Sequence, residues 1–394
     1  MIKVLFIIPS FASPGGAEKL VDSLVHLLNA HYEISIASFD PKYTKSYFKN
    51  ATAFYPLGDG PRLPYILRIF TYVISAYRLS VLKRELGVNL AISVLWRADL
   101  INVLSSGKEK IISLGVINIL NNETNAMMVK FRLLVGFFYR RFHKILAISP
   151  SLNKELITLY RLDKKKLGVF KNFLSISKTS PIFSDNLHRF VFCGRAVHEK
   201  NIDGLLFVFA KFTIKNPGRQ LVVIGDGPLL EYMKDLTVKL GLTFATQVTS
   251  DAQVLFTGSS TTPAAYMLGA RAFLLTSRHE GVPTVAILAA GLGLPILAAD
   301  CLGGGMRMLF EIPPDEPLLD PDFQVGDVAG LLLPVPESKL PETIDVWVRA
   351  MELVDRNQAK RDKWVQNALR LAAEHSPESV RKDWVSTIES TLVP

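Results

Sequence analysis

The sequence predicts an α/β protein built from two doubly wound, Rossmann-like domains that face one another across a cleft. Its 394 residues are too many for one small domain and enough for two sizeable cores. The 49% of hydrophobic and 21% of charged residues exclude disordered, collagenous and coiled-coil chains. Short apolar strands alternate with helical periodicity in both halves, and this alternation is typical of parallel sheets covered by helices.

The first domain opens with a strand, a glycine turn, a helix and a second strand. Val4–Ile8 is an apolar run rich in β-branched residues, and the turn Ser13–Gly16 ends it. Ala17–Asn29 carries leucines at helical spacing, and Tyr32–Phe39 is again strand-like. Strand–helix–strand units of this length predict a parallel sheet with right-handed crossovers.

The same alternation returns after residue 187. Further strands are predicted over Phe190–Cys193, Leu221–Ile224, Phe273–Thr276 and Pro295–Ala298, with helices over Gly204–Lys215 and Leu229–Leu240. From Pro341 the pattern is helical, with a break at His375–Pro377.

These patterns predict three parts of the chain. Residues 1–180 form an amino-terminal Rossmann-like domain, and residues 187–375 form a carboxyl-terminal one. The stretch 175–186 is polar, contains proline and lacks periodicity, so we expect the linker there. Residues 376–394 form a last helix that returns towards the first domain.

Charge is distributed unevenly along the chain. Residues 1–186 hold 25 Lys and Arg against 12 Asp and Glu, whereas residues 187–394 hold 20 against 24. The basic half predicts an anionic partner. No nucleic-acid-binding motif is present, so an anionic membrane surface is favoured over nucleic acid.

Two basic segments interleave cations with aromatic and aliphatic residues. Arg62–Glu85 includes Arg68, Arg78, Lys83 and Arg84, and Met128–Lys144 includes Lys130, Arg132, Arg140, Arg141 and Lys144. Such segments can lie in an anionic interface as basic helices. The alternative is two ordinary helices packed on the sheet with their cations outward.

The sequence also predicts a cellular location. The apolar start lacks the pattern of a secretory signal, and no apolar run approaches the length of a membrane span. Two cysteines, Cys193 and Cys301, cannot build a disulfide framework, which favours a reducing compartment. We therefore expect a cytoplasmic protein, peripheral on the inner face of the cell membrane.

Three motifs follow predicted strands and are candidates for chemistry. Gly15 and Gly16 precede the first helix, where backbone amides can receive a diphosphate; an ordinary tight turn is the alternative. Arg195 and Lys200 share a loop and can converge on one pyrophosphate, unless they are solvated surface cations. Glu280 can accept hydrogen bonds from hydroxyls, or it is only an acid at a helix start.

Taken together, these motifs resemble the retaining GT-B glycosyltransferases of family 4, the glycosyl transferases of group 1. The resemblance covers nearly the whole chain. Its elements are GGAE (Gly15–Glu18), Ala147–Ser149, Lys171–Asn172, GRxxxEKN (Gly194–Asn201), GDGPL (Gly225–Leu229), SxxEGxP (Ser277–Pro283), GLPI (Gly293–Ile296) and DCxGG (Asp300–Gly304).

The resemblance implies a GT-B fold and a retaining, metal-independent hexosyltransferase or N-acetylhexosaminyltransferase. Arg195 and Lys200 would hold the donor diphosphate and stabilise the charge of the departing nucleotide, and Glu280 would contact the sugar. The remaining residues implied in substrate binding are Gly15, Gly16, Gly194, Asn201, Gly281, Val282, Pro283 and Leu288. No cofactor is expected, because the nucleotide-sugar is a co-substrate. Residues 1–180 would then be the acceptor-side domain, and residues 187–375 would bind the nucleotide-sugar. The acceptor would be lipid-linked or a glycan.

The sequence departs from the family pattern at two places. Leu288 stands where the family usually has a second glutamate that binds the nucleotide ribose, and a leucine cannot accept a hydrogen bond from a hydroxyl. Many members also carry a histidine near the acceptor. The corresponding stretch, Ser113–Asn125, contains asparagines and Glu123 instead.

Two functions therefore remain open. One is an active transferase that extends a lipid-linked cell-surface glycan of the lipopolysaccharide, O-antigen or capsule type. The other is a GT-B-shaped, non-catalytic subunit or binding module with an impaired donor site, an alternative that Leu288 supports. Arg195, Lys200 and Glu280 favour the active enzyme, because an inactive protein would not need two cations placed to bind one diphosphate.

Overall fold

A computed structural model describes residues 1–8, 16–39, 50–57, 68–116, 132–174, 179–184, 188–313, 316 and 328–393. Contacts divide the chain into two compact units. The first contains Met1–Asn172 and Pro377–Pro394, and the second contains Phe173–Ser376. The last segment of the chain thus belongs to the first unit, and the division between the units falls just before the stretch in which we expected the linker.

The first unit is built on a parallel sheet. Its seven described strands have the order β3-β2-β1-β4-β5-β6-β7. They are β1 (Lys3–Ile8), β2 (Glu33–Ser38), β3 (Ala53–Pro56), β4 (Leu90–Val94), β5 (Lys110–Val116), β6 (Lys144–Ala147) and β7 (Leu167–Val169). The order reverses between β1 and β4, which is the doubly wound topology expected from the sequence.

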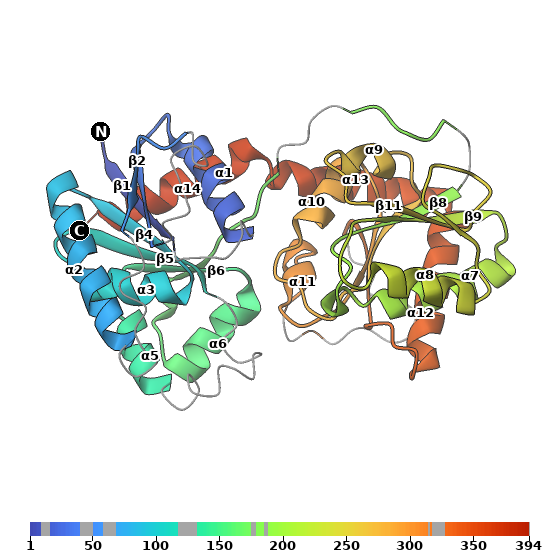
Figure 1. The fold of residues 1–394 in the computed structure, drawn as a ribbon, viewed down its shortest axis with the longest axis horizontal. Helices are drawn as coiled ribbons and strands as arrows, with labels where there is room; N and C mark the ends of the chain where they lie inside the picture. The colour runs from blue at the N-terminus through green and yellow to red at the C-terminus, as the bar shows by residue number, and fades with distance from the viewer. Residues whose placement is uncertain are drawn as a thin grey trace. The chain divides into compact units, whose positions relative to one another are not determined.

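Helices cover both faces of this sheet (Figure 1). The helices are α1 (Gly16–Leu28), α2 (Arg68–Leu86), α3 (Leu95–Leu104), α5 (Arg132–Tyr139), α6 (Pro150–Tyr160) and α14 (Pro377–Leu392). Side chains of α2, α3, α5 and α6 share one apolar cluster with the sheet, and α1 contacts α14 on the other face. Within the described ranges, no helix is both long and apolar enough to cross a bilayer.

The second unit repeats the same plan. Its sheet, as far as the chain is described, has seven parallel strands in the order β10-β11-β9-β8-β12-β13-β14. They are β8 (His188–Cys193), β9 (Arg219–Ile224), β10 (Phe244–Ala245), β11 (Val254–Gly258), β12 (Ala272–Leu275), β13 (Ile296–Ala299) and β14 (Gly330–Leu333). The strands read as continuous apolar runs because helices bury both faces.

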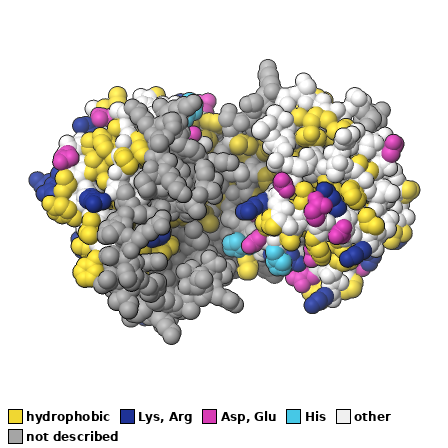
Figure 2. All heavy atoms as spheres, in the orientation of Figure 1, with side chains coloured by type: hydrophobic (Ala, Val, Ile, Leu, Met, Phe, Trp, Pro, Cys, Tyr) yellow, Lys and Arg dark blue, Asp and Glu magenta, His cyan; other side chains and the backbone are white. Residues whose placement is uncertain are grey.

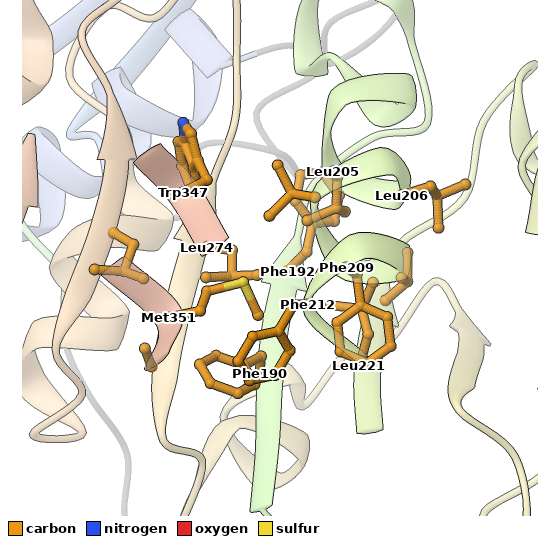
Figure 3. Packing of buried hydrophobic residues seen from close by; sticks show 14 of the residues in the cluster. Phe190, Phe192, Leu205, Leu206, Phe209, Phe212, Leu221, Leu274, Trp347 and Met351 are labelled. Atoms are coloured by element: carbon orange, nitrogen blue, oxygen red, sulfur yellow. The ribbon is translucent and has the colours of Figure 1, made fainter. Parts of the chain in front are cut away.

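Aromatic packing holds the second unit together. Its helices are α7 (Ile202–Lys215), α8 (Leu230–Lys239), α9 (Pro263–Met267), α10 (Thr284–Gly291), α11 (Gly305–Leu309), α12 (Pro341–Arg356) and α13 (Gln358–Glu374). Figure 3 shows Phe190 of β8 among Phe209 and Phe212 of α7, with Met351 of α12 beside them. The rings of Phe190 and Phe212 meet edge to face, 5.2 Å apart between centroids, a preferred aromatic geometry. This packing fixes β8 in the centre of the sheet.

Two details differ from the basic segments expected from the sequence. The helix within 128–144 ends at Tyr139, so Arg140 and Arg141 follow it instead of lying on it. Lys83 of α2 is buried rather than turned outward. Its Nζ donates to the Asn102 Oδ1 at 2.7 Å and pairs with Glu109 at 2.8 Å. Burial lowers the pKa of Lys83, and this cation is therefore not available to an anionic surface.

A buried carboxyl lies in the core of the first unit. Asp99 of α3 accepts hydrogen bonds from Ser93 at 2.7 Å, Ser113 at 2.8 Å and Tyr139 at 2.9 Å. Burial raises the pKa of Asp99 to about 7, although the three hydroxyl donors oppose that rise. The network ties β4, β5, α3 and α5 together.

Candidate functional site

The strand order of the second sheet reverses between β8 and β12. β9 and β11 lie on one side of β8, and β12 and β13 lie on the other. Ligands of doubly wound sheets bind at the carboxyl ends of the strands at such a position. The loop Gly194–Lys200 follows β8, and the loop Thr276–Pro283 follows β12. Two of the three sequence motifs therefore meet at one point.

Lys200 and Glu280 form an ion pair between these two loops. The Lys200 Nζ donates a hydrogen bond to the Glu280 Oε1. The side chains are only 22% and 9% exposed, so the pair is largely removed from water. A buried carboxylate is strongly destabilising without such a partner. The ammonium has three N–H donors, so Lys200 can bind an anion while it stays paired with Glu280.

Ser277 donates to the same carboxylate oxygen as Lys200 does. Its Oγ donates to the Glu280 Oε1 at 2.7 Å, and the backbone N–H of Glu280 donates to the Leu302 carbonyl at 2.9 Å. Ser277 is completely buried. The sequence motifs assigned no role to Ser277. Its position three residues before Glu280, at the end of a predicted strand, could have indicated this hydrogen bond. The arrangement fixes both the carboxylate and its backbone.

The loop after β8 is tied to the loop after β12 by further bonds. Thr276 Oγ1 donates to the carbonyls of Lys200 at 3.2 Å and Asn201 at 3.3 Å. The Arg278 N–H donates to the Glu199 carbonyl at 2.8 Å. These contacts place the backbone of Lys200 before any ligand arrives.

Asn201, which was expected to bind substrate, makes its side-chain hydrogen bonds within the protein. It is fully buried and has a left-handed backbone with φ of 51°. Its Nδ2 donates to the Pro336 carbonyl at 2.8 Å, and its Oδ1 accepts from the Gly204 N–H at 3.4 Å. The side chain thus caps the start of α7 and anchors the turn that carries Lys200.

Glycines bring a third loop against Glu280. Gly303 has φ of +99°, and a Cβ there would lie 2.1 Å from the Glu280 carbonyl oxygen. A Cβ on Gly305 would lie 1.3 Å from the Gly281 carbonyl oxygen. The loop that follows β13 therefore needs glycine at both positions, and its close approach fixes the backbone of Glu280 and Gly281.

The residues after Glu280 lead into α10. Val282 and Pro283 are buried, and Val282 packs in the core of the second unit. Pro283 occupies the position before the first helical residue and gives the helix no side-chain cap. α10 thus begins without a side-chain acceptor for its first amides, and such a helix start favours an anion.

Arg195 and Gly194 lie at the start of the β8 loop. Arg195 is exposed, and its guanidinium has no hydrogen bond or ion pair among the residues that the structure describes. A Cβ on Gly194 would lie 3.6 Å from the Lys200 Cε, so the glycine backbone borders the lysine side chain. The fold brings Lys200 and Glu280 together, but it does not join Arg195 to them.

Leu288 lies in the middle of α10 and is partly buried. It packs against the apolar cluster formed by the sheet, α10 and α13. An apolar side chain at this position strengthens the core, but offers no acceptor to a ligand hydroxyl.

Both cysteines lie close to this site, because Cys193 ends β8 and Cys301 stands in the loop after β13. Burial raises the pKa of Cys193 to about 11 and that of Cys301 to about 12, while the nearby Lys200 lowers both. Neither thiol is therefore a thiolate near neutral pH. Across the described ranges, no group of three or more His, Cys, Asp or Glu is arranged to hold a metal ion.

The candidate residues of the first unit are only partly visible. Gly16 is the first residue of α1, the helix that follows β1 (which ends at Ile8) along the chain, whereas Gly15 lies outside the described residues. The stretch with Asn118, Asn121, Asn122, Glu123 and Asn125 also lies outside them.

Residues 177–310 match the model of the family described as glycosyl transferases group 1. The match includes Arg195, Lys200, Glu280 and the glycines of the third loop. Over the whole chain, the amylovoran biosynthesis glycosyltransferase AmsD of Erwinia amylovora is 21% identical across 389 residues, which are 98% of this chain and 99% of that relative.

Solved structures share the fold over nearly the full length. The apo form of the lipopolysaccharide outer core galactosyltransferase WaaB has a TM-score of 0.70 and 19% identity, covering 99% of both chains. The HepE protein of Anabaena, in complex with UDP, has a TM-score of 0.74 and 18% identity, covering 99% of this chain and 100% of that one. The expected resemblance to group 1 glycosyl transferases is confirmed, and the fold is of the GT-B type.

Proposed function

We propose that this chain is a retaining glycosyltransferase that moves a sugar from a nucleotide-sugar to a growing, lipid-linked cell-surface glycan. Lipopolysaccharide, O-antigen and capsule are the classes of glycan in question. The observation that carries the proposal is the Lys200–Glu280 pair between the carboxyl ends of β8 and β12. The similarity to AmsD and WaaB supports the class of product, and the UDP complex of HepE supports a nucleoside diphosphate donor.

The proposed reaction needs positive charge where the donor diphosphate leaves. As the bond from the sugar to the diphosphate breaks, negative charge grows on the departing oxygen. Lys200 lies at a fixed position to stabilise that charge, and the exposed Arg195 can bind the same phosphates as a bidentate donor. The amides at the start of α10 add a third source of positive potential.

Glu280 would bind the sugar rather than the phosphates. Its Oε1 already accepts from Lys200 and Ser277, so its other oxygen is available to a sugar hydroxyl. Because the cations and the amides supply the charge, we propose that the reaction requires neither a metal ion nor a cofactor. Hexoses and N-acetylhexosamines are the sugars that we expect to be transferred.

A panel of UDP-, GDP- and ADP-sugars tests the proposal. We expect one donor to be bound and slowly hydrolysed without acceptor, with turnover unchanged by a chelator. The anomeric configuration of the transferred sugar, read by NMR of the product, tests retention. Absence of both binding and turnover with every donor would contradict the enzyme.

The second candidate is a non-catalytic subunit or binding module, and Leu288 favours it. This side chain packs into the core and leaves no carboxylate for a ribose. Two measurements separate the two functions. If the donor site is impaired by the missing carboxylate, the Leu288→Glu variant should bind the nucleotide more tightly than the wild type. Turnover by the wild type, with Leu288 in place, would rule out the second candidate.

A further inference from the structure

The proposed reaction changes the charge of the nucleotide that the donor site holds. A nucleoside diphosphate linked to a sugar carries one negative charge on each phosphate. Once the sugar has left, the terminal phosphate can ionise a second time, with a pKa of about 6. The product is therefore more negative than the donor near neutral pH, and a site that attracts the donor through its cations attracts the product more strongly.

The carboxylate of Glu280 lies beside the cation that would bind these phosphates. Its Oε1 accepts from the Lys200 Nζ, and the two side chains are only 9% and 22% exposed. Two acceptors bound to one ammonium lie roughly 5 Å apart, because each hydrogen bond is about 2.8 Å long. A phosphate oxygen that binds Lys200 would thus lie close to a negative charge in a site that is largely removed from water.

Glu280 cannot turn its carboxylate away from such a ligand without breaking other bonds. The Ser277 Oγ donates to the same Oε1 at 2.7 Å, and Ser277 is completely buried. The Glu280 N–H donates to the Leu302 carbonyl at 2.9 Å, and the backbone of Gly303 packs against the Glu280 carbonyl. The negative charge therefore stays in place while the product forms.

The carboxyl-terminal half of the chain has no excess of positive charge that could outweigh this carboxylate. Residues 187–394 hold 20 Lys and Arg against 24 Asp and Glu. On the face of the second unit that Figure 2 displays, cationic and acidic side chains are interspersed. Asp300, an acid in the loop after β13, pairs with Arg307 at 2.5 Å. The charges next to the phosphates therefore decide how strongly the site attracts a diphosphate.

We propose that Glu280 limits the affinity of the donor site for the nucleoside diphosphate product and so speeds its release. This inference rests on the proposed function, because it requires a diphosphate on Lys200. The fixed carboxylate repels the product more than the donor, since the repulsion grows with the charge of the ligand. Lys200 stabilises the charge on the departing oxygen, and Glu280 prevents the same attraction from trapping the product. Release of product, rather than chemistry, limits the rate of many enzymes.

Calorimetric titration of the wild type and of the Glu280→Gln variant tests this role. UDP, GDP and ADP are titrated first, followed by inorganic pyrophosphate and by the nucleoside of the diphosphate that binds. Glutamine removes the charge and keeps an oxygen that can accept from Lys200 and Ser277.

We expect the Glu280→Gln variant to bind the nucleoside diphosphate and pyrophosphate roughly tenfold more tightly than the wild type. A unit charge about 5 Å away accounts for a change of at least this size at an effective dielectric constant of about 20. The uncharged nucleoside should bind equally to both proteins, which also shows that the variant is folded. Stopped-flow displacement of a fluorescently labelled diphosphate should show slower release from the variant.

Two further variants serve as controls. Asp345→Asn makes the same change in net charge at the surface, where Asp345 pairs with Lys211 at 2.6 Å, and it should bind the diphosphate as the wild type does. Lys200→Met/Glu280→Gln lacks the cation as well as the carboxylate, and it should lose the gain in affinity.

Two results would overturn this role of Glu280. Equal affinity of the wild type and the Glu280→Gln variant would show that the ligand does not feel the carboxylate. Weaker binding by the variant would show that the carboxylate only holds Lys200 in place. Both results leave the proposed function intact. A wild type that binds none of the three nucleoside diphosphates would instead count against the proposed function, and pyrophosphate would still compare the two proteins.

Discussion

Replacing Lys200 by alanine should affect both the stability of the second unit and its catalysis, for different reasons. In the resting structure Lys200 is the cation paired with Glu280, whose side chain is only 9% exposed. Removing one partner of a fully buried pair costs about 3–5 kcal/mol. Because Ser277 still donates to the carboxylate and water can enter the space left by the lysine, we expect about 1–3 kcal/mol.

The catalytic loss has its origin in the departing diphosphate. An ammonium that stabilises charge formed only in the transition state contributes on the order of 2–4 kcal/mol. The Lys200→Ala variant should therefore lose about 30- to 900-fold in activity, mainly in kcat. Donor hydrolysis or transfer at saturating donor, measured beside urea unfolding, gives the two effects from the same preparations.

A second variant separates the two effects. Lys200→Met/Glu280→Gln replaces the ion pair by neutral groups of similar size, so most of the lost stability should return. Its activity should stay low, because the cation for the diphosphate is still missing. Lys211→Ala is the matched control: Lys211 pairs with Asp345 at the surface, and its loss should change stability by less than about 1 kcal/mol and leave kcat alone.

One result would refute the reasoning for Lys200. A folded Lys200→Ala variant with the kcat of the wild type would show that the lysine serves only to neutralise Glu280. Recovery of activity in the Lys200→Met/Glu280→Gln variant would lead to the same conclusion.

Three further predictions follow from single residues. Arg195→Ala should change the free energy of unfolding by no more than about 0.5 kcal/mol, because the exposed side chain has no partner among the described residues. It should lower kcat by roughly 30-fold or more, because the guanidinium is proposed to bind the departing diphosphate. An unchanged kcat in steady-state assays would show that Arg195 is only a surface cation. Gly303→Ala should cost more in unfolding free energy and in activity than Gly269→Ala. Both glycines have positive φ, worth about 1–3 kcal/mol of strain, but only the Cβ at Gly303 meets the Glu280 carbonyl; equal losses would contradict this. The folded pKa of Asp99, raised to about 7, means that the native state binds its proton more tightly than the unfolded state. The free energy of unfolding should therefore fall between about pH 4 and 7 by on the order of 4 kcal/mol at most, and the fall should be absent from Asp99→Asn when denaturation is followed against pH.

The sequence by itself determined the fold class and the strands that carry the chemistry. β1, β8, β9 and β13 begin or end within about two residues of the apolar runs that predicted them, because fully buried parallel strands need continuous apolar sequence. The arginine and glutamate motifs lie in loops after such strands. The resemblance assigned Lys200 and Glu280 to the same donor, and the two loops meet because parallel strands end at one edge of the sheet.

Only the tertiary structure decided which polar residues are partners and which are exposed. Asn201 and Lys83 look like surface residues in sequence, yet both are buried because the carbonyls and carboxylates that satisfy them come from distant parts of the chain. The stripe of Phe70, Val73, Ile74 and Tyr77 reads as an ordinary helix face, and periodicity alone cannot tell which of two apolar faces meets the sheet. Which face of α2 is buried depends on how α3 and the strands pack against it. A helix buries the face that fills the space between its neighbours, and the other face remains exposed.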